Sequence, residues 1–372
     1  MGFSSFDQEC MKLALREARK GLGKTFPNPC VGAVIAKHGK VLASGFHARA
    51  GMDHAEIVAL KKLGFPSSKR KISGADLYVT LEPCAFVGRT PPCMNAIEES
   101  GIARVFFAIR DPHDDEHLSE KTLKKHGVKV FSGLLEEESR TLNQFFLKNV
   151  LKKMPYVTSK VAMTLDGKIA TSSGDSRGIS SLESTHFVHS LRAVHQAIVV
   201  GVGTVGIDNP NLGVRFGKTG SATRGPDPLR VILDSKLLSD LSAQVFRDEN
   251  VVVFTTTTAP LFRKKAFLKK GIRVVSCGKT ITPRIVLRKL FTMGICSVFV
   301  EGGSQVLTSF WEAGMIDRYM TLIAPKLAGG KAALTPLSGK GISKVSRFSQ
   351  LQRASVSQFG SDVLVDGYLN WY

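Results

Sequence analysis

Apolar positions in residues 1–147 switch between helical and strand-like spacing. Met11, Leu15 and Ala18 recur at helical spacing and predict an amphipathic N-terminal helix. Two predicted strands joined by a turn at Gly39 indicate a hairpin. Helices and strands alternate after it, so we expect a sheet covered by helices. The other predicted helices span about 54–63, 92–100 and 118–126, and the predicted strands span 31–36, 40–44, 77–81, 105–109 and 129–131.

A basic segment that ends at Pro155 interrupts this pattern and begins near residue 147. The pattern then restarts with a strand at 156–163, a Gly/Ser-rich loop and a helix at 182–194. A chain of 372 residues is long enough for two domains, which we place at 1–147 and 148–372. Further strands are expected at 197–200, 229–233, 251–254, 273–275, 297–300, 319–323 and 363–368.

Composition narrows the class of protein. With 43% hydrophobic residues the chain can bury a sizeable core, but no apolar run is long enough to span a membrane. Six cysteines spread over this length do not form a disulfide framework, which indicates a reducing, cytoplasmic setting. The net charge of +20 permits a polyanionic partner, but the basic residues are scattered in short runs, which favours solvated faces.

Four residues carry the most specific chemistry. His54, Cys84 and Cys93 supply one imidazole and two thiolates, enough for three positions of a tetrahedral zinc with the fourth open to water. Glu56 is not needed as a ligand and can shuttle a proton, as in zinc nucleobase deaminases. The alternatives are a closed structural zinc site, for which His47 is the candidate fourth ligand, or two unrelated buried cysteines. We expect both cysteines just before or at a helix start, where the thiol pKa falls.

Two glycine-rich segments suggest a nucleotide. Gly201 to Gly206 matches G-x-G-x-x-G after a strand, but the Asn209-Pro210 pair predicts that no helix follows, so we expect a glycine loop near a cofactor. Val298 to Ser304 predicts a strand, two glycines and a helix start that could bind phosphate. A plain strand-to-helix turn explains the second pattern equally well.

With these motifs in view, the chain resembles, over nearly its whole length, the bifunctional deaminase-reductases of bacterial riboflavin biosynthesis. The eight-residue gap between Cys84 and Cys93 separates it from nucleoside and nucleic-acid deaminases, which mostly have Pro-Cys-x-x-Cys. The matching segments are 28–34, 45–47, 54–56, 80–84 and 88–93 in the first half, and 159–168, 200–204, 208–210, 230–235, 300–304 and 324–327 in the second.

The resemblance implies an α/β protein with a cytidine-deaminase-like three-layer α/β/α domain followed by a dihydrofolate-reductase-like α/β domain. It implies zinc-dependent hydrolytic deamination of 2,5-diamino-6-(5-phosphoribosylamino)pyrimidin-4-one. Reduction of the ribosyl group by NADPH then gives 5-amino-6-(5-phosphoribitylamino)uracil. We expect a homo-oligomer that acts on this phosphorylated pyrimidine and binds neither nucleic acid nor membrane.

The resemblance also implies a role for individual residues, with zinc on His54, Cys84 and Cys93 and proton transfer by Glu56. A lysine near the hydride site corresponds to Lys160. The positions that match the substrate-binding residues of the family's deaminase are Asn28, His47 and Arg89. Those that match the substrate-binding residues of its reductase are Ser176, Arg192, Leu212, Arg215 and Glu301. The NADPH positions are Ala162, Gly178, Thr204, Asp208, Ser235, Gly303 and Ser304.

Two departures from the family pattern keep alternatives open. Ala85, Phe86 and Val87 stand where the family usually has Ser-His-His, and Gly178 stands where it usually has Trp. The first departure loses imidazoles that help to hold the deaminase substrate, and the second loses a ring from the nicotinamide pocket. The zinc ligands are intact, so we expect both activities. The alternatives are a deaminase with an impaired reductase and a nucleic-acid-editing deaminase.

Overall fold

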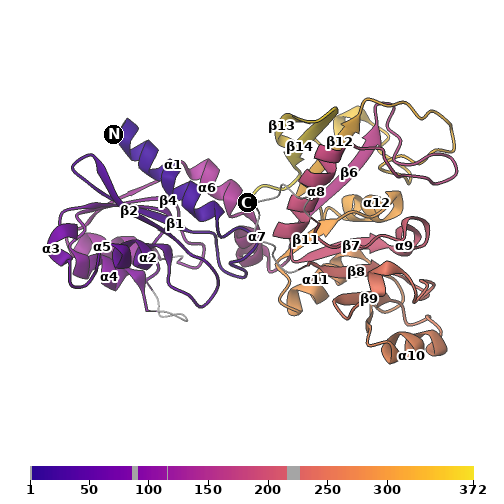
Figure 1. The fold of residues 1–372 in the computed structure, drawn as a ribbon, viewed down its shortest axis with the longest axis horizontal. Coiled ribbons are helices and arrows are strands. Elements are labelled where there is room, and N and C mark those ends of the chain that lie inside the picture. The colour runs from indigo at the N-terminus through magenta and orange to yellow at the C-terminus, as the bar shows by residue number, and fades with distance from the viewer. Residues whose placement is uncertain (1, 86–90, 115, 216–226) are drawn as a thin grey trace. The chain divides into compact units, whose positions relative to one another are not determined.

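The computed structural model describes residues 2–85, 91–114, 116–215 and 227–372. The chain divides into two compact units, Met1–Lys153 together with Tyr372, and Met154–Trp371 (Figure 1). The division lies six residues beyond position 147, because the helix α7 (Gln144–Lys152) continues through the basic segment. No helix in the described ranges is both long and apolar enough to cross a membrane.

The first unit is built on a five-stranded sheet in the order β2-β1-β3-β4-β5. The predicted hairpin forms between β1 and β2, and β1 also pairs antiparallel with β3, whereas β3, β4 and β5 run parallel. The strands are β1 (Gly32–Lys37), β2 (Lys40–Phe46), β3 (Asp76–Leu81), β4 (Arg104–Ile109) and β5 (Lys129–Ser132).

Alternation along these strands places a hydrophobic core on each face of the sheet. In β3, Leu77 and Val79 face a core shared with α2, α4 and α5, while Tyr78 faces a core shared with α1 and α6. Figure 1 shows α1 and α6 on one side of the sheet and the other group on the opposite side, so the unit has three layers. The helices are α1 (Ser5–Arg19), α2 (Ala55–Lys62), α3 (Lys69–Ile72), α4 (Cys93–Ser100), α5 (Leu118–Lys125), α6 (Glu136–Leu142) and α7.

The second unit is built on a nine-stranded sheet in the order β10-β9-β8-β7-β11-β6-β12-β14-β13 (Figure 1). The strands from β10 to β12 run parallel, and β14 and β13 add an antiparallel edge. The strands are β6 (Tyr156–Thr164), β7 (Ala197–Gly201), β8 (Leu229–Leu233), β9 (Val251–Thr255), β10 (Arg273–Ser276), β11 (Ser297–Val300), β12 (Arg318–Ala324), β13 (Gln352–Phe359) and β14 (Asp362–Tyr368).

Helices cover both faces of this sheet as well. One core contains side chains of α8 (Leu182–Val194) and α10 (Leu261–Lys269), and the other contains side chains of α11 (Pro283–Thr292) and α12 (Ser304–Glu312). Parallel strands buried on both faces require such cover. The two-domain α/β architecture expected from the sequence is therefore confirmed.

One local prediction is wrong. A helix, α9 (Val202–Asp208), forms directly after β7, although we expected Asn209-Pro210 to prevent it. The proline does not prevent the helix, because α9 ends at Asp208, two residues before Pro210, and Asn209 adopts the left-handed conformation at φ 43°. The glycines at 203 and 206 therefore lie within a short helix rather than in a loop.

Candidate active sites

Three separate elements bring the predicted metal ligands together in the first unit. His54 is the N-cap of α2, Cys84 follows the end of β3, and Cys93 is the first residue of α4. The expectation of a helix start is confirmed for Cys93 but wrong for Cys84, which follows a strand. Cys84 nevertheless contacts the start of α4, because its Sγ accepts a hydrogen bond from the backbone N–H of Cys93 at 3.3 Å.

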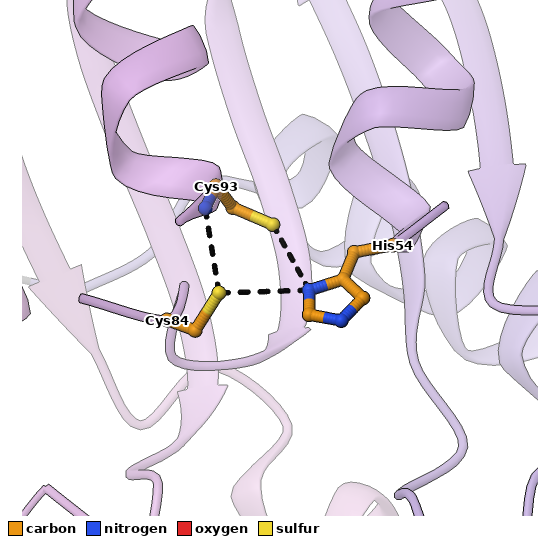
Figure 2. A group of neighbouring side chains, drawn as sticks. All are labelled: His54, Cys84 and Cys93. Carbon is orange, nitrogen blue, oxygen red and sulfur yellow. Dashed lines mark hydrogen bonds between the residues drawn. The ribbon is translucent and has the colours of Figure 1, made fainter. Parts of the chain in front are cut away.

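The ligand atoms of these residues face one another (Figure 2). His54 Nδ1 lies 3.1 Å from Cys93 Sγ and 3.5 Å from Cys84 Sγ, and all three donor atoms lie within 4.8 Å of one another. Tetrahedral zinc bonds to nitrogen and sulfur place such donors about 3.6 Å apart. The residues therefore fit a zinc ion with little rearrangement.

The electrostatics of the cluster favour a cation. The pKa of Cys84 falls to about 4, first because Cys93 donates a hydrogen bond to it and then because His54 lies beside it. The pKa of Cys93 is raised well above its usual value by its contact with the Cys84 sulfur and by burial. The two thiols thus hold one proton between them, and a divalent cation would displace it.

His47 does not act as a fourth ligand in this arrangement. Its Nδ1 contacts the backbone oxygen of Asp53 at 3.0 Å, and its Nε2 contacts the Asn28 amide nitrogen at 3.1 Å. A ring nitrogen that accepts from an amide is not available to a metal. This geometry argues against a closed four-ligand site and for an open coordination position.

Glu56 lies in the first turn of α2, two residues after His54, and is only 3% exposed. Burial raises the pKa of this carboxyl to about 7, so it can exchange a proton near neutral pH. A buried carboxyl beside the metal ligands is the arrangement that a proton shuttle needs.

A pocket of about 550 Å³ opens over the cluster. It is lined by His54, Cys84, Glu56 and two of the predicted substrate residues, Asn28 and His47. Arg89, the third predicted substrate residue, lies outside the described residues, as does Phe86. The volume suits a small organic substrate.

Sequence analysis missed further residues that line this pocket, among them Glu82, Asp111 and His113. His113 Nδ1 lies 3.1 Å from the Asp111 carboxylate. A signal was present, because Asp111 follows β4 and Cys84 follows the adjacent parallel strand β3, so the carboxyl ends of both strands meet at one edge.

In the second unit, an ion network stands where β6, β7 and β11 lie side by side. Glu301 follows β11 and binds Lys160 of β6 at 3.2 Å and Arg192 of α8 at 2.7 Å. Burial opposes ionisation of Glu301, but the two cations outweigh it and lower its pKa. The structure therefore brings Glu301 together with two cations that lie more than 100 positions earlier in the sequence.

Three predicted cofactor residues meet at the start of α12. The Gly303 N–H donates to Thr204 Oγ1 at 3.3 Å, so the turns after β7 and β11 are joined. Ser304 Oγ is buried and lacks a hydrogen-bond partner within the described residues. A phosphate group would supply the missing acceptor at this helix N-terminus, so the turn fits a nucleotide cofactor.

The other predicted reductase residues are more dispersed. Ser176 donates to Asp208 at 2.9 Å, and Arg192 donates to the Gly213 carbonyl at 3.3 Å, close in sequence to Leu212 and Arg215. The remaining positions occupy separate places, namely Ala162 in β6, Gly178 at φ 72° before α8, and Ser235 after β8.

The comparisons with known proteins agree with both halves of this description. Residues 155–365 match the RibD C-terminal domain family, and residues 4–109 match the zinc-binding region of cytidine and deoxycytidylate deaminases. The riboflavin biosynthesis protein RibD of Aquifex aeolicus is 40% identical over 360 residues, which cover 96% of this chain and 97% of the relative. The chain belongs to the RibD family.

Solved structures extend this likeness to the fold. A Thermotoga maritima RibD-type protein is described as a diaminohydroxyphosphoribosylaminopyrimidine deaminase and 5-amino-6-(5-phosphoribosylamino)uracil reductase. It shares 38% identity and a TM-score of 0.83, with 98% of each chain covered. RibD of Acinetobacter baumannii in one crystal form gives 32% identity and a TM-score of 0.84, again with 98% of each chain covered.

As a RibD protein, this chain is a bifunctional enzyme of riboflavin biosynthesis. The first unit is a zinc-binding deaminase domain, and the second is an NADPH-dependent reductase domain.

Proposed function

We propose that the deaminase unit hydrolyses the 2-amino group of 2,5-diamino-6-(5-phosphoribosylamino)pyrimidin-4-one. We further propose that the reductase unit converts the ribosyl group of the product to ribityl. The observation that carries the first step is the cluster of His54, Cys84 and Cys93 beside a buried Glu56 in one pocket. We place the enzyme in the cytoplasm, a reducing compartment, because none of its six cysteines forms a disulfide in the described residues.

In the deaminase unit, the two thiolates and the imidazole would hold zinc. When bound, zinc supplies a Lewis acid that makes water nucleophilic near neutral pH. Glu56 takes one proton from the attacking water and delivers it to a ring nitrogen. It then takes the second proton from the same oxygen and delivers it to the amino group, which leaves as ammonia while the carbonyl forms. Asn28 and His47, which already contact each other at 3.1 Å, would orient the pyrimidine.

In the reductase unit, Arg192 and Arg215 would bind the substrate, with Arg215 at the phosphate, since guanidinium groups suit phosphate oxygens. Lys160 stands beside Glu301 at 3.2 Å and would polarise the ribose oxygen bonded to the carbon that receives the hydride. The turn at Gly303 and Ser304 would receive a phosphate of NADPH, for which the buried Ser304 hydroxyl is the supporting observation.

A coupled assay tests both steps in one sample. Zinc-loaded protein is given the diaminopyrimidine substrate and NADPH, and ammonia release is followed together with the loss of nicotinamide absorbance. We expect both signals, with NADPH oxidation dependent on prior ammonia release. Ammonia without NADPH oxidation would indicate an impaired reductase, for which Gly178 is the candidate cause. Neither signal, with deamination of RNA instead, would overturn the proposal in favour of nucleic-acid editing.

A further inference from the structure

The loop from Asn209 to Arg215 carries two of the residues proposed to bind the reductase substrate, and its backbone is unusual. Asn209 has φ 43° and Leu212 has φ 57°, both in the left-handed region. Leu212 is nevertheless 3% exposed, so its side chain is packed in the core. A leucine in this conformation is strained and persists only where the surroundings hold it.

Contacts from several elements hold this loop. Arg247 donates to the Asn211 carbonyl at 2.6 Å, and Arg192 donates to the Gly213 carbonyl at 3.3 Å. Within the loop, the Gly213 N–H donates to the Asn211 side chain at 3.1 Å. Because Arg192 also binds Glu301, the loop is linked to the ion network of the substrate site.

The last described residue of the loop, Arg215, is held by a histidine. The backbone N–H of Arg215 donates to His189 Nδ1 at 3.1 Å. His189 lies on α8, three residues before Arg192, so one face of this helix holds both the middle and the end of the loop. His189 is 5% exposed, whereas the side chain of Arg215 is exposed.

The direction of this hydrogen bond defines the state of the imidazole. A backbone N–H can only donate, so Nδ1 must carry a lone pair and the ring proton must sit on Nε2. Burial, followed by the charges of Arg192 and Arg215, lowers the pKa of His189 to about 4. The imidazole therefore stays neutral at the pH of an ordinary enzyme assay.

We propose that His189 is a positioning residue of the reductase: its Nδ1 fixes the backbone of Arg215 and thereby aims the guanidinium at the substrate phosphate. The proposal rests on the proposed assignment of Arg215 to that phosphate. His189 itself does not touch the reacting atoms in this role. Its loss should weaken recognition of the phosphate and leave the hydride step largely intact.

A set of full-length variants separates this role from a structural one. His189→Asn keeps an acceptor near the place of Nδ1, His189→Leu removes it, and His189→Gln keeps a polar group but moves the acceptor further out. Each is assayed for NADPH oxidation with 5-amino-6-(5-phosphoribosylamino)uracil and with its unphosphorylated counterpart. Circular dichroism and the fluorescence of the two tryptophans, both of which belong to the second unit, are the control for folding of that unit.

For the phosphorylated substrate, we expect His189→Leu and His189→Gln to raise KM about tenfold, the effect of one lost hydrogen bond of ordinary strength, with little change in kcat. His189→Asn should restore most of the affinity, and KM for the unphosphorylated compound should not change. A fall in kcat at constant KM, or an equal rise in KM for both compounds, would overturn the proposal. If His189→Leu fails to fold, the Gln and Asn variants still make the comparison.

Arg215→Ala distinguishes the two ways in which the idea can fail. If this variant loses the preference for the phosphorylated substrate while the His189 variants do not, the positioning role is wrong and the phosphate assignment stands. If Arg215→Ala keeps the preference, the phosphate assignment is wrong, and the proposal for His189 is overturned with it.

Discussion

Two buried glutamates line the deaminase pocket, and their neighbours distinguish them. Burial raises the pKa of both Glu56 and Glu82 to about 7, so protonation alone does not separate them. Glu56 lies two residues from a metal ligand at the start of α2. Glu82 Oε2 instead accepts the backbone N–H of Asp111 at 3.2 Å and joins the ends of two strands. Position, rather than acidity, is therefore the reason to propose Glu56 as the proton shuttle.

Replacement of Glu56 tests this assignment. Glu56→Gln should lower kcat for ammonia release by roughly 10²–10⁴-fold, the range that a general acid or base supplies, because an amide cannot exchange the proton. Zinc content, measured by elemental analysis, should stay at one ion per chain, since Glu56 is not a ligand. Glu82→Gln in the same pocket should reduce ammonia release far less. Loss of zinc in Glu56→Gln would contradict its role as a shuttle.

At the level of single residues, the sequence predicts those functional groups that lie close together along the chain in one motif. His54, Glu56, Cys84 and Cys93 lie within 40 positions, and the structure brings the three ligands together as predicted. His189 was missed because its partner is a backbone N–H 26 residues away, which no side-chain pattern reveals. Contacts of this kind depend on the packing of α8 against a loop.

Most elements with a buried face were predicted, whereas β13 and α10, which are largely exposed, were missed. Strand β13 is exposed along most of its length, so its residues show no alternation to detect. Helix α10 buries only Phe267 and carries a basic run that favours a solvated surface. Helix α11 was overlooked although Thr282 caps it and Pro283 stands in its first turn, a signal that was present in the sequence.

Helix α8 ends at a buried histidine that links it to the central sheet. Leu191 O lies 2.7 Å from His195 Nδ1, and Thr158 Oγ1 of β6 lies 2.9 Å from Nε2. The ring also stacks on Phe299 of β11. Burial lowers the pKa of His195 from 6.5 to about 4, so the folded unit keeps this imidazole neutral.

This burial predicts how the stability of the second unit depends on pH. Between about pH 6.5 and pH 4 the unfolded chain binds a proton that folded His195 does not bind, so the free energy of unfolding should fall as the pH is lowered. The loss at the lower end is roughly 3 kcal/mol for one such group. His189, whose pKa is also about 4, should add to it.

Urea titrations followed by tryptophan fluorescence can measure this effect, because both tryptophans, Trp311 and Trp371, belong to the second unit. His195→Phe should be less stable than the parent at pH 7 but should lose less stability on acidification. His186→Gln, an exposed change on the same helix, should leave the pH dependence of the parent unchanged. An equally steep pH dependence in His195→Phe would show that another group causes it.

At the scale of the whole molecule, the residues proposed for each activity lie in a single unit. The metal ligands and Glu56 belong to Met1–Lys153, and the ion network and the turn at Ser304 belong to Met154–Trp371. Each unit also has hydrophobic cores of its own. Because the two active sites are supported by separate cores, we expect one activity to continue when the other is disabled.

Removal of zinc tests this independence. Chelation should abolish ammonia release and lower the thermal stability of the first unit, because the Cys84 and Cys93 thiolates lose the cation that balances their charge. NADPH oxidation with supplied 5-amino-6-(5-phosphoribosylamino)uracil should continue at nearly its original rate, since no predicted ligand lies in the second unit. Cys93→Ser should reproduce this pattern without a chelator, and added zinc should restore ammonia release only in the parent. A parallel loss of both activities would instead mean that the reductase depends on the metal-bound state of the deaminase.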